Sequence, residues 1–377
     1  MNPMDYIDQH QSEIETTYHA LHSLAEPSWK EEQTSRYIRE RLTEAGLSVK
    51  TFSGHYGLIA EIPGQSSEIV ALRADMDALV QEVDGVVKPN HSCGHDAHST
   101  MVLYAALSIA ASGVTPKHTL RFIFQPAEEK GEGALQMMNE GALENVTKLF
   151  GVHLRPKVEV PFNKASAAIM HASAGSIIGT IKGRQAHAAR PKEGINAIEA
   201  AALIVQKLKQ MDLQTEIPHS IKMTRLIVEN EASNVIPETA VFTLDARAQS
   251  NEVMQELMRQ AKEAIKESAH ETGAVISLSR EECLPAATLN PEAMKLAERA
   301  IAEILGKDNV TERCVSQGGE DFHFYTVKNP GLKATMVGLG CDLAPGLHHP
   351  QMSFQLKALH YGAKILTKTV LLASENK

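Results

Sequence analysis

The order of predicted strands and helices changes twice along the chain, and this change constrains the fold more than any other feature of the sequence. Up to about residue 172, buried-strand patterns such as "IVALRAD" alternate with helical patterns such as "EEQTSRYIRERLTEAGL", which predicts a mostly parallel α/β sheet. Residues 173–285 instead give the order βαββαβ, which is typical of a ferredoxin-like domain. The alternation of strands and helices then resumes. We therefore predict one discontinuous α/β domain, 1–172 with 286–377, and an inserted domain at 173–285.

The composition and charge of the 377-residue chain exclude several classes of protein. With 43% hydrophobic and 22% charged residues, the chain can bury a core. A formal net charge of −9 without a block of lysine and arginine argues against nucleic acid and anionic membrane surfaces as partners. The sequence has neither a basic and apolar leader nor a run of about 18 apolar residues, so we expect a cytoplasmic protein without a membrane span. The four cysteines lie far apart, which predicts reduced thiols.

The stretch "NHSCGHDAH", residues 90–98, contains one cysteine and three histidines. Cys93 and His95 precede a predicted helix at the carboxyl edge of the predicted sheet, where ligand sites are common. A thiolate and an imidazole two residues apart can bind one Zn²⁺, Mn²⁺, Co²⁺ or Ni²⁺ ion. Two donors alone do not make a metal site, because a buried cysteine beside a capping histidine is the ordinary interpretation of such a pair. Further ligands are therefore needed.

A pair of carboxylates, Glu128 and Glu129, follows the apolar strand pattern "TLRFIFQP". Acidic pairs in loops are usually solvated, but this pair comes directly after a buried strand. Neighbouring side chains at a strand end diverge, so one carboxylate can face a metal while the other faces a water molecule and acts as its general base. The spacing does not decide which glutamate has which role.

Four more candidates occupy the ends of predicted strands. His153 ends the strand pattern "LFGVH", and "GLHHP" offers His348 or His349 after the strand "KATMVGLG". Asp75 and Asp77 follow "IVALRAD", where the ordinary interpretation is a helix cap or a turn. Each signal is weak by itself. The placement of all of them at one edge of the predicted sheet favours a metal site.

Eight short motifs now identify a family resemblance. The segments occur in the order "ALRADMDAL", "CGHDAH", "FQPAEE", "GVHL", "QAHAARP", "NVIPET", "GGEDF" and "LHHP". This order and spacing resemble the amidohydrolase branch of the M20 metallopeptidases, which includes aminoacylases and indole-acetyl-amino-acid hydrolases and, more distantly, carboxypeptidases and dipeptidases. The resemblance covers nearly the whole chain. It implies a catalytic α/β domain that binds metal and an inserted lid or dimerisation domain.

The resemblance implies a role for each residue of the α/β domain that matches a family motif. Glu128 matches the general base, and Asp77 matches the aspartate that supports the metal site. Asp75 stands where distant carboxypeptidases have a ligand histidine. The metal ligands implied by the resemblance are Cys93, His95, Glu129, His153 and His348. His349 remains an alternative to His348. These ligands would hold one or two divalent ions (Zn, Mn, Co or Ni), and Cys93 would bridge the ions where two are bound.

The inserted domain matches three further family residues. In relatives, the histidine that corresponds to His187 reaches across a dimer and stabilises the developing oxyanion, which implies a homodimer. Asn234 in "NVIP" resembles a residue that contacts the substrate. Arg247 in "LDAR" could anchor a carboxylate through its planar fork, although a salt-bridged strand arginine is an equally good interpretation.

The sequence departs from the family pattern near the expected substrate pocket. The segment Asn90–Ser92 replaces the run that commonly precedes "CGHD", Lys130 replaces a glycine, and Gln185 with Ala186 replaces a glycine pair. None of these changes removes an expected ligand. They bear on the substrate rather than on the chemistry.

These features predict a metal-dependent amidohydrolase that cleaves the amide bond of N-acyl amino acids or related amide conjugates, with metal-activated water and Glu128 as general base. Small-molecule N-acyl amino acids or short peptides are the expected partners. Three alternatives remain: a dipeptidase or carboxypeptidase with the same chemistry, a binding protein with a degenerate site, and a redox protein that uses Cys93.

Overall fold

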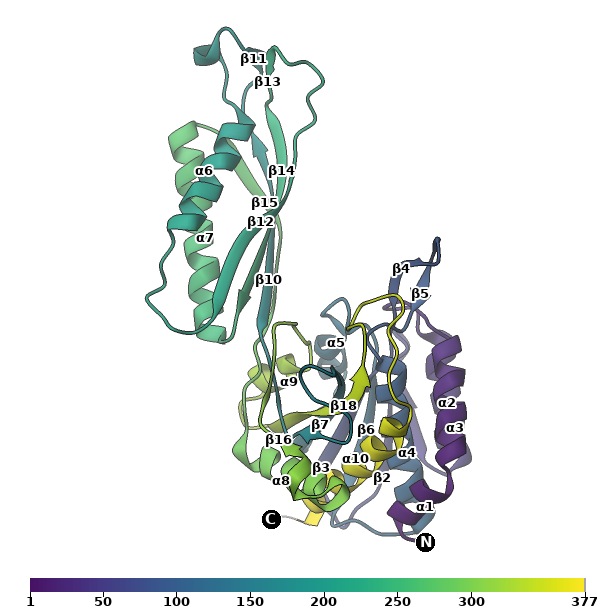
Figure 1. Cartoon of the computed structure of the whole chain (residues 1–377). Coiled ribbons are helices and arrows are strands. Elements are labelled where there is room, and N and C mark those ends of the chain that lie inside the picture. The colour runs from purple at the N-terminus through teal and green to yellow at the C-terminus, as the bar shows by residue number, and fades with distance from the viewer. Residues whose placement is uncertain (376–377) are drawn as a thin grey trace. The chain divides into compact units, whose positions relative to one another are not determined.

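The computed structural model describes residues 1–375, and the chain divides into two compact units. Unit 1 comprises Met1–Met170, Thr288–Val315 and Asp321–Lys377, and unit 2 comprises His171–Ala287 and Ser316–Glu320. Both are shown in Figure 1. Within the described range, no helix combines the length and apolar character needed to cross a membrane. Each unit has its own hydrophobic core and is described separately.

An eight-stranded sheet forms the centre of unit 1, in the order β1-β2-β6-β3-β7-β18-β8-β16. The ladders β6/β3, β3/β7, β7/β18 and β8/β16 are parallel, which confirms the predicted mostly parallel sheet. The strands are β1 (Ser48–Thr51), β2 (Leu58–Ile62), β3 (Ser66–Asp75), β6 (His118–Gln125), β7 (Val146–Pro156), β8 (Ala165–Ser166), β16 (Val310–Thr311) and β18 (Lys333–Leu343).

Helices cover this sheet and complete the core of unit 1. They are α1 (Pro3–Gln9), α2 (Gln11–Ser23), α3 (Glu32–Glu44), α4 (His95–Ser112), α5 (Gly133–Asn139), α8 (Pro291–Leu305), α9 (His323–Lys328) and α10 (Lys357–Glu375). Almost every residue of α4 is buried, because it packs on β3 and β7 and against α1, α2 and α10. Gly362 of α10 makes that packing possible, since a Cβ atom there would lie 2.0 Å from the sulfur of Met101 in α4.

A two-stranded hairpin, β4 (Leu79–Val83) and β5 (Val86–Asn90), projects from unit 1 (Figure 1). Its turn contains Asp84 and Gly85, both with positive φ, as a two-residue hairpin turn of type I′ requires. This hairpin was not predicted from the sequence. The Asp-Gly pair between two valine-rich runs was the signal that predicts a hairpin.

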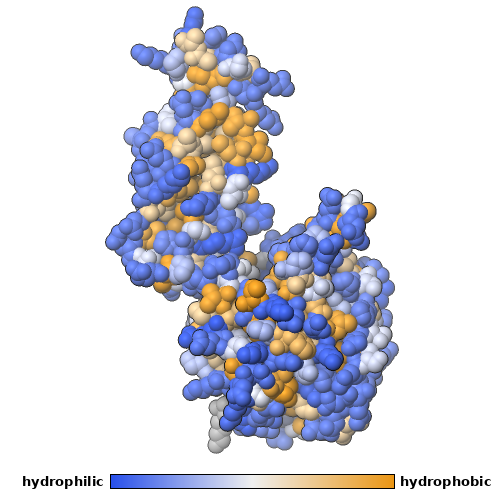
Figure 2. All heavy atoms as spheres, in the orientation of Figure 1, coloured by the Kyte–Doolittle hydropathy of each residue, from blue (hydrophilic) through white to orange (hydrophobic). Residues whose placement is uncertain are grey.

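Unit 2 is an antiparallel sheet in the order β12-β14-β10-β15 with two helices, which confirms the βαββαβ prediction. Its elements are β10 (Ser173–Lys182), β11 (Ala186–His187), a 3-10 turn (Pro191–Glu193), α6 (Ala197–Gln210), β12 (His219–Ile227), β13 (Val235–Ile236), β14 (Thr239–Ala248), α7 (Asn251–Thr272) and β15 (Val275–Leu284). Figure 2 shows apolar side chains on the drawn face of unit 2. Leu226 and Ile227, at the end of the edge strand β12, are exposed.

Two short strands, β9 (Ile169–His171) and β17 (Cys314–Ser316), and a 3-10 turn at Lys307–Asn309 complete the elements. The chain passes from unit 1 to unit 2 within each of these strands. The crossing within β9 leads into the main part of unit 2, His171–Ala287. The crossing within β17 adds the five residues Ser316–Glu320 to unit 2.

Candidate metal centre

Parallel strands direct the predicted ligands of unit 1 to one place. His153 lies near the carboxyl end of β7, the glutamate pair follows β6, and the loop that carries His348 follows β18. Cys93 and His95 lie at the start of α4, where Gly94 has a φ of +88° that a side chain would strain. The five residues therefore come to the same edge of the sheet.

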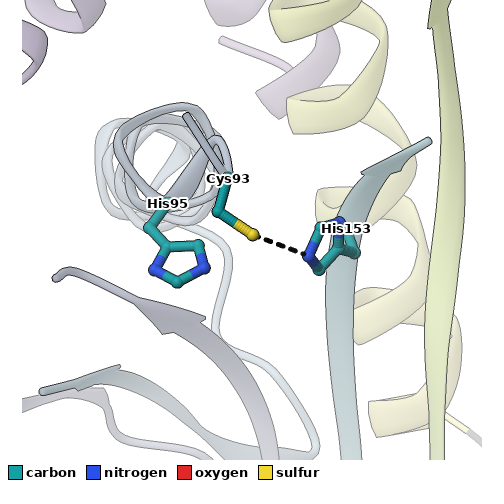
Figure 3. Close-up of side chains that lie close together, drawn as sticks. All are labelled: Cys93, His95 and His153. Carbon is teal, nitrogen blue, oxygen red and sulfur yellow. Dashed lines mark hydrogen bonds between the residues drawn. The ribbon is translucent and has the colours of Figure 1, made fainter. Parts of the chain in front are cut away.

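Three donor groups converge there, and in each the ligand atoms lie within 4.8 Å of one another. One contains Cys93, His95 and His153, which are shown in Figure 3. The Cys93 sulfur lies 3.7 Å from Nε2 of His153. The second group contains Cys93 with Glu129 and His348, and the third contains His95 with both glutamates. The first two groups share Cys93, so the arrangement offers two adjacent ion positions.

Asp77 orients the histidine and the glutamate pair together. Its carboxylate accepts hydrogen bonds from Nδ1 of His95 at 3.2 Å, from the Ser28 hydroxyl at 2.6 Å, and from the backbone N–H groups of Glu128 and Glu129 at 3.1 and 3.0 Å. The bond to His95 holds a proton on Nδ1, so that Nε2, which lies 3.8 Å from each glutamate, is the nitrogen available to a metal ion. A carboxylate behind a ligand histidine is the usual second layer of a metal site.

Buried polar atoms in the centre lack partners that a cation would supply. His95 Nε2 and Glu129 Oε1 lie 3.8 Å apart. Both are buried, and neither has a hydrogen-bond partner among residues 1–375. Leaving such atoms unsatisfied is costly. Thiolate, imidazole and carboxylate donors suit a divalent transition ion, so the residues present fit a metal.

The charges in the centre also favour a cation. Burial, together with the like charge of Asp77, raises the pKa of Glu129 to about 7, and burial raises that of the Cys93 thiol well above its ordinary value. Burial would lower the pKa of His95, but Asp75 and Cys93 outweigh it and raise that pKa well above its ordinary value. The charges around His95 therefore stabilise positive charge in the centre, while burial keeps protons on Glu129 and Cys93 that a bound metal ion would displace.

The surroundings of His348 and His349 distinguish these two candidate ligands. Nε2 of His348 lies 3.7 Å from Glu129 Oε1. His349 belongs to none of the convergent donor groups found in residues 1–375, and its Nδ1 accepts a hydrogen bond from the backbone N–H of Gln351. The geometry therefore favours His348, the first choice from sequence.

Asp75 lies behind the donors and belongs to a buried network. It accepts hydrogen bonds from Nδ1 of His98 at 2.7 Å and from Arg73 at 2.6 Å. Arg73 also contacts Gln125 and Asp321, each at 2.8 Å. This network fixes the ends of β3 and β6 beneath the donors.

His98 is a part of the centre that the sequence analysis missed. Its ring packs against His153 with centroids 4.6 Å apart, and its Nε2 accepts the backbone N–H of Leu154 at 3.0 Å. The available signal was helical spacing, because His98 follows His95 by three residues and so lies on the same face of α4.

The other three predicted site residues lie in unit 2. His187, in β11, is exposed, and its Nδ1 accepts the N–H of Ala189 at 3.0 Å. Asn234 is exposed beside it, with its carbonyl bonded to the N–H of Ala188. Arg247 forms a two-bonded pair with Asp245 at 3.0 and 2.8 Å, which is the salt-bridged arrangement considered from sequence. These three residues belong to a different unit from the metal donors.

Replacing Asp77 with asparagine is expected to weaken metal affinity by about 10–100-fold, as for other residues that orient metal ligands. The amide nitrogen of asparagine cannot accept the hydrogen bonds that one carboxylate oxygen now accepts. Titration of metal-free protein with Mn²⁺ measures the effect. Asp84→Asn, in the exposed hairpin turn, is the matched control. An Asp77→Asn protein with wild-type affinity would contradict the orienting role.

Replacing Arg73 with methionine is expected to lower the free energy of unfolding by about 3–5 kcal/mol, because it leaves Asp75 and Asp321 buried without their cation. Chemical denaturation measures the loss. The exposed Arg39→Met is the control for removing an arginine. A loss below about 1 kcal/mol is the usual value for a surface ion pair. It would contradict the expectation that the variant leaves buried carboxylates without a compensating charge.

Comparison with known proteins gives one consistent result. The model of a family described as "Peptidase family M20/M25/M40" matches residues 71–372. An "IAA-amino acid hydrolase ILR1-like 2" of Arabidopsis thaliana is 32% identical over 92% of this chain and 81% of its own length. An "N-acetylcysteine deacetylase" of Bacillus subtilis is 30% identical over 94% of this chain and 95% of its own.

A solved structure extends this similarity to the fold. The YXEP protein of Bacillus subtilis, described as a dinuclear metal binding peptidase from the M20 family, superposes with a TM-score of 0.82 at 26% identity. The match covers 98% of this chain and 100% of that one. The relative with two metals thus has the same fold over its whole length.

Proposed function

Because this chain belongs to the peptidase family M20/M25/M40, and is therefore a hydrolase that binds one or two divalent metal ions, we propose that it cleaves the amide bond of N-acyl amino acids. The observation that carries the proposal is the convergence of Cys93, His95, Glu129, His153 and His348 in overlapping donor groups, one of which includes Glu128. The family relationship predicted from eight motifs is confirmed by the family match.

The proposed metal ligands are the five convergent donors. Cys93, His95 and His153 would hold one ion, and Cys93, Glu129 and His348 the other. An ion bound there would polarise the amide carbonyl and lower the pKa of the attacking water. The protein supplies the proton transfer and the positioning.

Glu128 is proposed as the general base. Its Oε1 accepts the backbone N–H of Asp321 at 3.4 Å, and its Oε2 lies 3.8 Å from Nε2 of His95, facing the donors. Oε2 would take a proton from the attacking water and deliver it to the amine nitrogen as the C–N bond breaks. The products are a carboxylate and an amine.

The substrate class is proposed from the relatives. Their printed names include hydrolysis of IAA-amino acids and deacetylation of N-acetylcysteine, which are both N-acyl amino acid substrates. The alternative is a peptidase that uses the same residues, as described for the structural relative from Bacillus subtilis.

The test combines elemental analysis of the purified protein with a hydrolysis screen after the metal is restored. We expect one or two equivalents of a divalent ion and faster hydrolysis of N-acetyl and indole-acetyl amino acids than of dipeptides. Faster hydrolysis of dipeptides would favour the peptidase. Metal binding without hydrolysis of any amide would favour a binding protein with a degenerate site.

A homodimer through unit 2 is also proposed. The edge strand β12 carries the exposed Leu226 and Ile227, and an exposed edge with apolar side chains is suited to pair with another copy. Light scattering should give the mass of a dimer for the wild type and of a monomer for Ile227→Lys. A monomeric wild type would contradict this proposal.

His187 is proposed to act in the partner's centre. Because its Nδ1 accepts a hydrogen bond, the neutral ring carries its proton on Nε2, which can donate to a developing oxyanion. If so, mixing inactive His187→Ala protein with inactive Glu128→Gln protein should restore activity, since mixed dimers contain one complete centre. No recovery after subunit exchange would contradict action across the interface.

A further inference from the structure

The hairpin β4–β5 leads directly into the metal centre. Strand β5 ends at Asn90, three residues before Cys93. The opposite end of the hairpin is its exposed turn at residues 84–85. Any contact made near Asn90 is therefore close, along the backbone, to the donor shared by both proposed ion positions.

Two polar side chains of the hairpin bind the loop that carries His348. Gln81 and Asn90 lie on the same face of the hairpin. Asn90 pairs with Leu79, and Leu79 and Gln81 point to the same side because side chains alternate along a strand. Nε2 of Gln81 donates to the carbonyl of His348 at 3.2 Å. Nδ2 of Asn90 donates to the carbonyl of Pro350 at 3.0 Å and to Oε1 of Gln81 at 2.7 Å.

A third contact joins this loop to the cysteine segment. The backbone N–H of His348 donates to the carbonyl of Ser92 at 2.7 Å. Both backbone groups of His348 are thus hydrogen-bonded: its N–H donates to Ser92, and its carbonyl accepts from Gln81. The carbonyl of Pro350 is held by the amide that also orients Gln81.

His348 depends on these backbone contacts more than the other ligands do. Its side chain is 56% exposed, whereas that of His95 is fully buried and held by Asp77. Among residues 1–375, no carboxylate hydrogen-bonds its ring in the way that Asp77 holds His95. It also has a φ of +63°, and a non-glycine residue keeps this backbone conformation where its surroundings hold it.

We propose that Gln81 and Asn90 are positioning residues for His348 and set the affinity of one ion position, that of Cys93, Glu129 and His348. Their side-chain hydrogen bonds go to His348, Pro350 and each other and not to Cys93, His95 or His153, so we expect the other position to keep its affinity without them. The hairpin thereby controls how many ions the centre holds at a given metal concentration. This inference rests on the proposed metal-dependent function, because it requires both donor groups to bind ions.

The test is calorimetric titration of metal-free protein with Mn²⁺ alone. We expect two binding events for the wild type and loss of one of them in His348→Ala. The event lost in His348→Ala should be weakened about tenfold, the lower end for residues that orient ligands, in Gln81→Met and in Asn90→Leu. The remaining event should keep its wild-type affinity.

Val80→Ala is the control variant, because Val80 is exposed on the other face of the same strand. It should bind both ions as the wild type does, and thermal unfolding should show that all variants are folded. Unchanged affinities in Gln81→Met and Asn90→Leu, equal weakening of both events, or a single event in the wild type would overturn the inference. Failure of the metal-loaded wild type to hydrolyse any amide would instead contradict the proposed function, and it would leave the titration result standing.

Discussion

Replacing Glu128 with glutamine is expected to lower kcat for amide hydrolysis by about 10²–10⁴-fold, the usual contribution of a positioned general base. Glutamine has nearly the same size, and its amide oxygen can still accept the N–H of Asp321. It cannot take a proton from water at neutral pH. Steady-state kinetics with an N-acetyl amino acid measures the change, and elemental analysis should show unchanged metal content.

The matched variants decide which glutamate has which role, a question that sequence spacing left open. Glu129→Gln is expected to lose metal, because Oε1 of Glu129 lies within reach of both His95 and His348. Glu298→Gln, an exposed glutamate of α8, should behave as the wild type. Loss of metal in Glu128→Gln with retention in Glu129→Gln would reverse the assignment. Full activity in Glu128→Gln would contradict the proposed mechanism.

Removing the metal is expected to abolish hydrolysis, with a fall of roughly 10³-fold or more for several kcal/mol of lost transition-state stabilisation. Dialysis against a chelator, followed by assay before and after addition of Mn²⁺ or Zn²⁺, measures the loss and the recovery. Because the ion binds the folded protein, the chelated form should also unfold at a lower temperature. The same protein dialysed without chelator is the control.

Cys93→Ala gives the corresponding result by mutation. Cys93 belongs to both proposed ion positions, so its loss should lower the metal content of both and prevent recovery by added metal. Activity that survives chelation but disappears in Cys93→Ala would instead support the redox alternative. Activity that survives both treatments would contradict any role of this centre in hydrolysis.

The positions of three proposed ligands were predictable because these residues follow or end strands. An apolar run such as "TLRFIFQP" predicts a buried strand, and parallel strands bring their carboxyl ends to one edge. Glu129, His153 and His348 each follow or end such a run, so one pattern places them together although the inserted residues separate His153 from His348. Helix α8 follows an equally local signal, since Asn290 caps it and Pro291 begins it.

Other residues could not be placed from the sequence, because their partners are distant in the chain and no local pattern joins them. Glu31 is one example: its carboxylate accepts the N–H of Ala127 at 2.9 Å and so holds the turn before Glu128. A charged residue at a helix start is ordinarily exposed, and burial raises the pKa of Glu31 to about 7. The same limit applies to the histidines of "NHSCGHDAH". The sequence alone does not distinguish His95, which faces the glutamates, from His98, which hydrogen-bonds to Asp75 and Leu154.

The position of β18 in the sheet affects how the protein is made. This strand pairs with β7 in the middle of the large sheet, but it is translated after the whole four-stranded sheet of unit 2. A nascent chain on the ribosome can therefore complete the unit 2 sheet while β7 still has an open edge, which is a site for mispairing until β18 emerges. If His348 is a metal ligand as proposed, the ion position that it completes cannot form before the loop after β18 has been synthesised and folded.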